Sequence, residues 1–259
     1  MCESLKPFPA RQVTVITDFT HSPTHPWLQS HDQFVVCPTG DSYRQSLQLG
    51  YDESSCVRIS GPVVRPQFYP QSGDEDQKVT WRLRLGLDPT WPTYLLLFGG
   101  SPPTRLVEEI ALALVAQSNA ETQLNIVCIC GSNERLFDLL SQHQARGTLP
   151  NTRLFGRSDD VPTIMKSVDV VVTKPGPGVV SEALVTRTPL VLFCDGRTME
   201  QELPVETFVR IHGVGKIVDS PSQVYCQSSE LVQIRQAMTR LPENQGVFEL
   251  REFLLSRVF

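Results

Sequence analysis

Short apolar runs alternate with amphipathic stretches along almost the whole chain. Several of the runs are continuous in Val, Leu and Ile, which is typical of strands that are buried on both faces of a parallel sheet. Nine runs predict strands: residues 13–17, 34–37, 57–59, 94–98, 125–130, 152–155, 170–173, 190–193 and 216–218. Between them, a period of 3.6 residues predicts helices at 105–117, 134–143 and 161–167. We therefore expect an α/β fold with a doubly wound parallel sheet.

A change of composition at residues 66–77 predicts a linker, because two prolines, a glycine and three consecutive acidic residues lie there. It would divide a partial N-terminal α/β domain, residues 1–70, from a C-terminal domain, residues 71–259. The N-terminal part holds only three predicted strands, fewer than the usual ~5–6 of a sheet. A last helix, 248–257, carries an apolar stripe that must dock on another part of the protein.

Composition excludes several classes of protein. The net charge of −5 and the pI near 5.6 argue against a nucleic-acid partner. Seven cysteines, an odd number without framework spacing, indicate a reducing compartment. Cys128 and Cys130 would share one face of a strand, and no further ligands at a suitable spacing complete a metal site, so we interpret them as small buried hydrophobic residues.

The N-terminus lacks the residue order of a signal peptide, and the longest apolar runs are far shorter than the ~20 residues that cross a bilayer. We therefore expect a cytoplasmic protein whose contact with a membrane, if it has one, is peripheral.

The most informative motif is the turn Gly176-Pro177-Gly178, which follows the strand 170–173 and precedes a predicted helix. Such a turn is stiff and poor in side chains, so its backbone can approach a ligand closely. The helix that follows offers free N–H groups and its positive dipole end to a phosphate. Glu182, in the first turns of this helix, could accept bonds from ribose hydroxyls. The pattern predicts a nucleotide site; the alternative is a tight loop followed by an acid that stabilises the helix.

Three more loops fall at the carboxyl ends of predicted strands, where open α/β sheets bind ligands. They are Gly99-Gly100-Ser101, Gly131-Ser132-Asn133 and the segment that contains Gln201 and Glu202. Ser101 is the expected N-cap of the helix that begins near Pro102-Pro103. Gln201 and Glu202 could bond the hydroxyls of a sugar. The alternatives are ordinary Gly/Ser-rich loops and a solvated acidic helix start.

These motifs, taken in order, resemble glycosyltransferase family 28. The segments that carry the likeness are 17–18, 25–27, 61–66, 99–100, 131–133, 156, 174–178, 181–183, 189–192 and 201–202. The likeness covers roughly residues 13 to 220. It is strongest to the monogalactosyldiacylglycerol synthase branch and weaker to the bacterial lipid II glucosaminyltransferase.

The resemblance implies a GT-B fold with two Rossmann-like domains. It also implies inverting transfer of a hexose, galactose or glucose, from a UDP-sugar to a lipid-type acceptor, without a bound metal and with no cofactor besides the donor. Glu182 would then bond the ribose, and Gln201 with Glu202 would hold the sugar. The residues expected to line the diphosphate are Gly99, Gly100, Ser101, Gly176, Pro177 and Gly178, with Gly131 in the same crevice and Lys174 as an added positive charge.

The chain also departs from the family's pattern. Family members open with a glycine-rich loop whose His is expected to deprotonate the acceptor, and we expect this chain to begin after that loop. His25 is the candidate general base because imidazole suits this chemistry at neutral pH, and Asp18 is a second candidate; the alternative is that His25 is an ordinary polar loop residue. Pro102 and Pro103 offer a diphosphate fewer N–H donors, and Glu200 adds a negative charge.

Another departure is the segment 186–188, which replaces one that usually contains a helix-ending glycine. Two classes of function follow. One is a glycosyltransferase that is incomplete as a single chain, either because the gene model is truncated or because a partner chain supplies the missing N-terminal half. The other is a non-catalytic UDP-sugar-binding or interaction protein, or the donor-binding subunit of a split enzyme. An NAD-dependent oxidoreductase is disfavoured because no G-x-G-x-x-G follows a strand.

Overall fold

The computed structural model describes residues 11–19, 28, 30–118, 123–196 and 199–258. These residues form two parallel sheets, one of three strands in the order β1-β2-β3 and one of six in the order β6-β5-β4-β7-β8-β9. All nine predicted strands are present, with ends within two residues of the prediction. The expected α/β class and doubly wound parallel sheet are therefore confirmed.

The large sheet owes its order to continuous apolar runs. Its strands are β4 (Thr93–Leu96), β5 (Asn125–Ile129), β6 (Thr152–Phe155), β7 (Val170–Thr173), β8 (Leu190–Phe193) and β9 (Gly215–Val218). Every residue of β4, β5, β7 and β8 is buried, as the unbroken apolar pattern predicts for strands covered on both faces.

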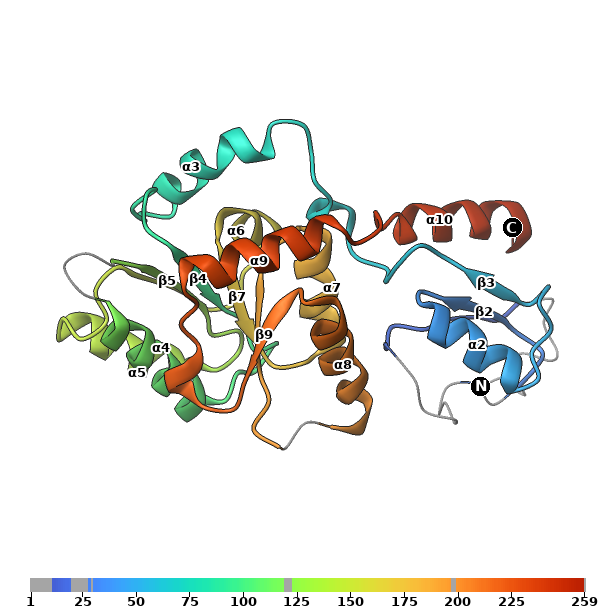
Figure 1. Ribbon diagram of the computed structural model, residues 1–259, viewed down its shortest axis with the longest axis horizontal. Helices are drawn as coiled ribbons and strands as arrows, with labels where there is room; N and C mark the ends of the chain where they lie inside the picture. Colours follow the sequence, from blue (N-terminus) through green and yellow to red (C-terminus); the bar gives the residue numbers. More distant parts are fainter. Residues whose placement is uncertain (1–10, 20–27, 29, 119–122, 197–198, 259) are drawn as a thin grey trace.

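Helices cover both faces of the large sheet (Figure 1). Side chains of α6 (Val161–Ser167), α7 (Pro177–Val185) and α8 (Leu203–His212) pack on one face. Side chains of α4 (Thr104–Gln117), α5 (Glu134–Ala145) and the first part of α9 (Ser228–Thr239) pack on the other. The helices α4, α5 and α6 confirm the three helices that periodicity predicts.

The small sheet consists of β1 (Val13–Val15), β2 (Phe34–Cys37) and β3 (Cys56–Arg58). The helix α2 (Gly40–Gln48) packs its apolar residues on one face. The helix α10 (Gly246–Phe253), extended by the π-helical turn η4 (Leu254–Val258), lies beside the sheet in Figure 1. The ring centroids of Phe34 and Phe253 are 5.4 Å apart, which confirms that the last helix docks.

We call β1–β3, α2, α10 and η4 the small lobe, and the six-stranded sheet with the helices from α3 to α9 the large lobe. The segment predicted as a linker is partly helical, which corrects that prediction. It contains the 3₁₀ turn η1 (Pro66–Phe68) and the start of α3 (Asp74–Arg84). Phe68 is completely buried in the core of the large lobe, so the segment is fixed by apolar packing. The domain boundary between residues 70 and 71 stays a prediction.

Two chain segments cross between the lobes, and they touch each other. Asn244 Nδ2 donates a hydrogen bond of 2.9 Å to Pro62 O. A Cβ atom on Gly246 would lie 2.2 Å from Gly61 O, so only a glycine fits there. The chain therefore leaves the small lobe and returns to it at one place.

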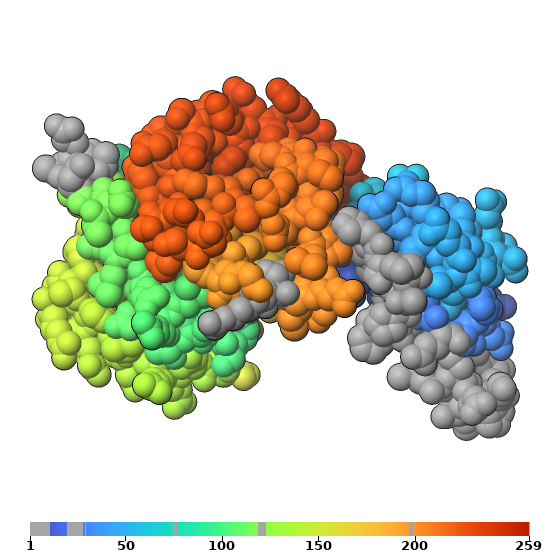
Figure 2. All heavy atoms as spheres, turned by 60° about the horizontal axis from the view of Figure 1, so that its bottom comes forward, coloured from blue at the N-terminus to red at the C-terminus, as the bar shows by residue number. Residues whose placement is uncertain are grey.

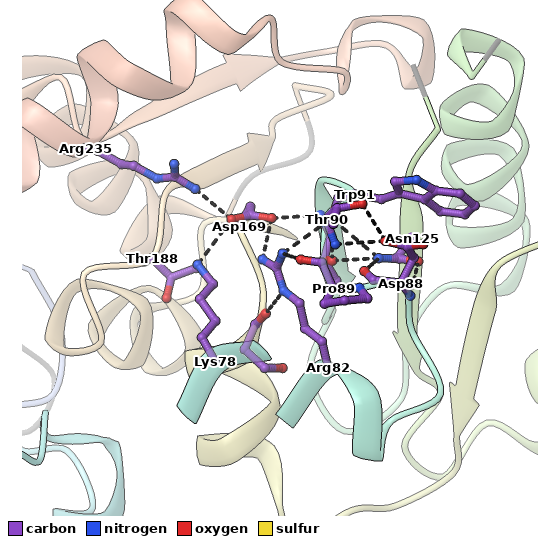
Figure 3. A network of polar contacts seen from close by, with 12 residues as sticks. Lys78, Arg82, Asp88, Pro89, Thr90, Trp91, Asn125, Asp169, Thr188 and Arg235 are labelled. Carbon is purple, nitrogen blue, oxygen red and sulfur yellow. Dashed lines mark hydrogen bonds and ion pairs between the residues drawn. The ribbon is translucent and has the colours of Figure 1, made fainter. Parts of the chain in front are cut away.

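At the start of β7, Asp169 is the centre of a buried polar network (Figure 3). Its carboxylate contacts Arg82 Nη2 at 2.6 Å, Arg235 Nη2 at 2.7 Å and Lys78 Nζ at 3.1 Å. Burial alone would raise the pKa of Asp169, but Lys78 and Arg82 lower it below its usual value. The network fixes α3 and α9 at the amino end of the large sheet.

Candidate functional site

The strand order of the large sheet reverses between the neighbouring strands β4 and β7. The loops that follow these two strands therefore lie at the same point of the carboxyl edge, on either side of a crevice. Open α/β sheets bind ligands at such a switch point. The loop after β4 contains Gly99 and Gly100, and the loop after β7 contains the turn Gly176-Pro177-Gly178. The fold therefore brings together two of the loops that sequence analysis selected.

The loops after β4 and β5 are joined through their backbones. Gly131 has a φ of 58°, and a Cβ atom there would lie 2.2 Å from Gly100 O. Ser132 donates to Gly100 O through both its backbone N, at 2.8 Å, and its hydroxyl, at 2.9 Å. A Cβ atom on Gly99 or Gly100 would have no neighbour within 4 Å among the described residues, which leaves this side of the loop open to a ligand.

Ser101 does not cap the helix that follows, which corrects the prediction. The N-cap of α4 is Pro103, and the helix begins at Thr104. Asn133 connects the two loops by donating to Pro102 O at 2.7 Å and to Thr104 Oγ1 at 2.9 Å. Ser101 is exposed beside Gly100 and remains a candidate ligand contact.

The turn before α7 has the predicted form. Gly176 is the N-cap and Pro177 the first helical residue, so the first N–H groups of α7 have no partner within the helix. Lys174 Nζ lies 2.6 Å from Glu202 Oε1, in an ion pair that joins the β7 loop to the turn η2 (Glu200–Glu202). Glu202 is buried and Gln201 is exposed, so only one of the two predicted sugar contacts is held in place.

Glu182 lies on α7, half-buried, five residues after Pro177. Burial raises the pKa of Glu182, and the positive charge of Arg65 partly opposes this effect. The resulting pKa is about 7, above the usual value of a glutamate. Arg65 comes from the segment that leaves the small lobe, and its guanidinium lies 5.1 Å from the ring centroid of Phe68. The motif 61–66 contains Arg65, but sequence analysis gave it no role because the partner, Glu182, is more than a hundred residues away.

Arg187 takes the left-handed backbone conformation that favours a glycine at the end of a helix. Its φ is 56°, in the left-handed region, directly after the C-cap of α7. Its guanidinium donates to the carbonyl oxygens of Met238, Leu241 and Pro242. The substitution is therefore compensated by bonds to the segment that returns to the small lobe.

A cleft of about 840 Å³ separates the two lobes. Strand-end loops of the small lobe line it with Phe19 and Gly40, and α8 lines it with Phe208 and Ile211. The ring centroids of Phe19 and Phe208 are 5.1 Å apart, so the two lobes touch at this point of the cleft. In Figure 2 the surface of the large lobe formed by residues near 200–215 faces the small lobe. Asp18, half-buried, directly precedes Phe19 and so lies near this cleft, whereas His25 lies outside the described residues.

Two other predictions concern cysteines and membranes. Cys128 and Cys130 are buried on β5 and directly after it, with their sulfur atoms 3.9 Å apart, which confirms their interpretation as core residues. Within the described ranges, no cluster of three or more His, Cys, Asp or Glu is placed to hold a metal ion. No helix in the described part of the chain is both long and apolar enough to cross a bilayer.

Curated relatives match nearly the whole chain. Monogalactosyldiacylglycerol synthase 1 of Arabidopsis thaliana is 29% identical over 249 residues, which cover 92% of this chain and 45% of the relative. The processive diacylglycerol beta-glucosyltransferase of Staphylococcus carnosus is 29% identical over 230 residues, covering 89% of this chain and 55% of the relative. The chain thus spans about half the length of these relatives.

The fold and a family model agree with these matches. HepE of Anabaena, solved in complex with UDP and glucose, superposes with a TM-score of 0.54 at 15% identity, covering 95% of this chain and 72% of that one. Such a likeness shows the fold, which is GT-B. The model of the glycosyltransferase family 28 C-terminal domain matches residues 94–233, more than half of the chain. The chain therefore belongs to glycosyltransferase family 28.

Proposed function

We propose that this chain binds a UDP-hexose at the carboxyl edge of the large sheet. We further propose that it transfers galactose or glucose, with inversion, to a hydroxyl of a diacylglycerol-like acceptor. The observation that carries the proposal is the meeting of the β4 and β7 loops at the switch point, where the free N–H groups of α7 are available. The named activities of the matched relatives, which act on diacylglycerol, support this choice of substrates.

Each part of the donor has a candidate partner. The N–H groups of Gly178 and Val179, in the first turn of α7, and the open backbone at Gly99-Gly100 would hold the diphosphate, in place of a metal ion. Glu182 would accept bonds from the ribose hydroxyls, while Gln201 and Glu202 would bond those of the hexose. Backbone donors that are already fixed need no reorganisation when charge develops on the leaving UDP, which is why they favour transfer.

The acceptor would enter through the cleft between the lobes, which is lined by strand-end loops of the small lobe and by the helix α8 of the large lobe. Its apolar lining, which includes Phe19, Phe208 and Ile211, suits the glycerol and acyl part of a lipid. Peripheral contact with the membrane that holds this lipid would bring acceptor and donor together. His25 or Asp18 would then take the proton of the acceptor hydroxyl.

A second candidate function is binding of a UDP-sugar without transfer, or service as the donor-binding subunit of a split enzyme. The observation that favours it is that none of the candidate donor-site residues lines the described part of the cleft between the lobes. In this case a partner chain would supply the acceptor side of the site. Both candidates require the same donor site, so donor binding is tested first.

Calorimetry with UDP-galactose, UDP-glucose and ADP-glucose tests the donor site. We expect the two UDP-hexoses to bind and ADP-glucose to bind much more weakly. A transfer assay with labelled UDP-hexose and diacylglycerol in mixed micelles then separates the two candidates. Binding with transfer supports the enzyme, and binding without transfer supports the binding protein or subunit. Absence of binding by either UDP-hexose contradicts both.

A further inference from the structure

We propose that Lys174 is a positioning residue that acts on the donor through Glu202, by neutralising and orienting this buried carboxylate at the N-terminus of α7, and that it does not itself bind the diphosphate. This inference rests on the proposed function, because it concerns the same donor site. It revises the expectation that Lys174 adds positive charge at the diphosphate.

The geometry joins three parts of the site. Lys174 Nζ lies 2.6 Å from Glu202 Oε1, and the Glu202 side chain is 6% exposed whereas that of Lys174 is 46% exposed. A Cβ atom on Gly176 would lie 3.6 Å from Lys174 Cε and 4.0 Å from Glu202 Oε1. The ion pair therefore lies against the N-cap of α7, where the diphosphate is proposed to bind.

Charge explains why the pair matters to an anionic ligand. A carboxylate at a helix N-terminus is stabilised by the helix dipole, and it competes there with any other anion. Uncompensated, the buried charge of Glu202 would repel a diphosphate at Gly176, and its burial would be costly in itself. Lys174 reduces both the repulsion of the diphosphate and the cost of burying the carboxylate, because the ion pair has no net charge.

The contact also orients Glu202 for a second task. One carboxylate oxygen, Oε1, accepts from Lys174, and the other, which has no hydrogen-bond partner among the described residues, can accept a bond from a hexose hydroxyl. A lysine that already donates to a buried carboxylate at 2.6 Å would have to break this ion pair to reach a phosphate. The structure thus assigns Lys174 to the sugar side of the donor site.

A double-mutant cycle distinguishes the two roles, with the affinities for UDP and for UDP-hexose measured by calorimetry. Lys174→Met should weaken UDP binding by about tenfold or more, since it leaves the Glu202 charge unpaired. Glu202→Gln should change UDP affinity by less than about threefold, and it should abolish the preference for UDP-hexose over UDP. The double variant Lys174→Met/Glu202→Gln should recover UDP affinity to within about threefold of the unmodified chain, without the preference for hexose.

Lys174→Arg, unlike Lys174→Met, keeps a cation next to Glu202. It should therefore keep both the UDP affinity and the hexose preference, whereas a merely structural role of Lys174 would not tie these two properties to a positive charge. Arg210→Met is the matched control, because it removes a cation from the exposed pair with Glu206 on the neighbouring helix α8. We expect it to change neither affinity. Thermal unfolding of each variant, compared with the unmodified chain, shows that the fold is retained.

The inference is overturned if the double variant binds UDP as weakly as Lys174→Met, because Lys174 would then contact the diphosphate directly. It is also overturned if Glu202→Gln keeps the preference for UDP-hexose. In both cases the unmodified chain still binds UDP, so the proposed function stands. If the unmodified chain binds no UDP, the proposed function fails and this inference fails with it.

Discussion

The central strand β7 of the large lobe and the strand β1 of the small lobe have the same parallel pairing but different surroundings. β7 is paired on both sides, with β4 and β8, and all four of its residues are buried. Within the described residues β1 pairs only with β2, and all three of its residues are half-buried. The centre of the large sheet is thus covered on all sides, whereas β1 is an edge strand to which no described strand is added on its outer side.

The two lobes also differ in where their helices come from. The helices of the large lobe follow its strands directly in the sequence, but the small lobe uses α10, which is about two hundred residues from β2. The family model matches residues 94–233, entirely within the large lobe. The large lobe is therefore expected to hold donor binding and most of the stability, and the small lobe to depend on its partners.

Of the substitutions considered, removal of the Asp169 carboxylate should have the largest effect on stability, and it acts on the large lobe. Asp169→Asn leaves the buried Arg82, the half-buried Lys78 and the exposed Arg235 without their counter-charge, so we expect a loss of about 3–5 kcal/mol in the free energy of unfolding. Urea unfolding measures it, with Asp138→Asn on the exposed face of α5 as the control. Because the pKa of Asp169 is lowered, its contribution should be present above the usual pKa of an aspartate and lost as the pH falls through the lowered value. Equal stability of both variants would contradict this role.

Proline substitutions in β1 should show whether the outer edge of this strand is open. Phe34 N donates to Gln12 O and Ile16 N donates to Val36 O, so alternate residues of β1 bond to β2 and the N–H of Val15 points to the outer edge. Thr14→Pro should cost about 3 kcal/mol, whereas Val15→Pro should cost about 1 kcal/mol or less. Hydrogen exchange of the Val35 and Val36 amides reports on the small sheet. Comparable losses for the two prolines would mean that the outer edge is also paired.

Glu182→Ala should weaken UDP binding by about 1.5–3 kcal/mol, because the ribose hydroxyls would lose their acceptor. Calorimetry measures the change, and Val15→Pro serves as the control because it alters only the small lobe. If Val15→Pro weakens UDP binding as much as Glu182→Ala, the donor site is not confined to the large lobe. An unchanged affinity of Glu182→Ala would remove the assigned role.

The raised pKa of Glu182, about 7, predicts opposite pH effects on binding and on stability. An ionised carboxylate accepts stronger hydrogen bonds, so UDP affinity should rise between about pH 6 and 8 relative to that of Glu182→Gln. Folding favours the protonated form, so this contribution to stability should be complete below the usual pKa of a glutamate and lost as the pH rises through about 7. Comparison with Glu182→Gln cancels the titration of UDP itself. Parallel pH profiles for the two proteins would contradict the prediction.

The smallest effect is expected at Arg187, where the two lobes are connected. Arg187→Ala loses the bonds to the 238–242 carbonyl groups and keeps a left-handed residue, so we expect a loss of about 1–2 kcal/mol. Arg187→Gly loses the same bonds but relieves the backbone strain, and it should be the more stable of the two variants. Thermal unfolding distinguishes them. The reverse order would mean that the left-handed conformation costs nothing here.

The strands of both sheets could be predicted because each leaves a short, mostly apolar run in the sequence, continuous in the central strands of the large sheet. The helix α3 could not, since its sequence is mostly polar and Lys78 and Arg82 hold it to Asp169, about ninety residues away. The fold and the meeting of the β4 and β7 loops thus follow from local patterns and from the rules of parallel sheets.

The side-chain contacts of the site depend on distant partners, which a single sequence does not show. Lys174 is paired with Glu202, 28 residues away, and Arg65 acts on Glu182. The N-cap of α4 was predicted at Ser101 from residue type alone, but two prolines separate Ser101 from the first helical residue and move the cap to Pro103. The substrate contacts of the predicted glycines stay predictions.

The return of α10 to the small sheet has a consequence for synthesis on the ribosome. β1 and β2 leave the ribosome before the large lobe does, yet Phe34 can meet Phe253 only after the whole large lobe has been made. The face of the small sheet on which α10 docks therefore stays uncovered while the six-stranded sheet folds, because domains fold as their complete sequences emerge. Translation that stops before residue 246 would release a chain with a finished large lobe and an unfinished small one, a natural substrate for chaperones.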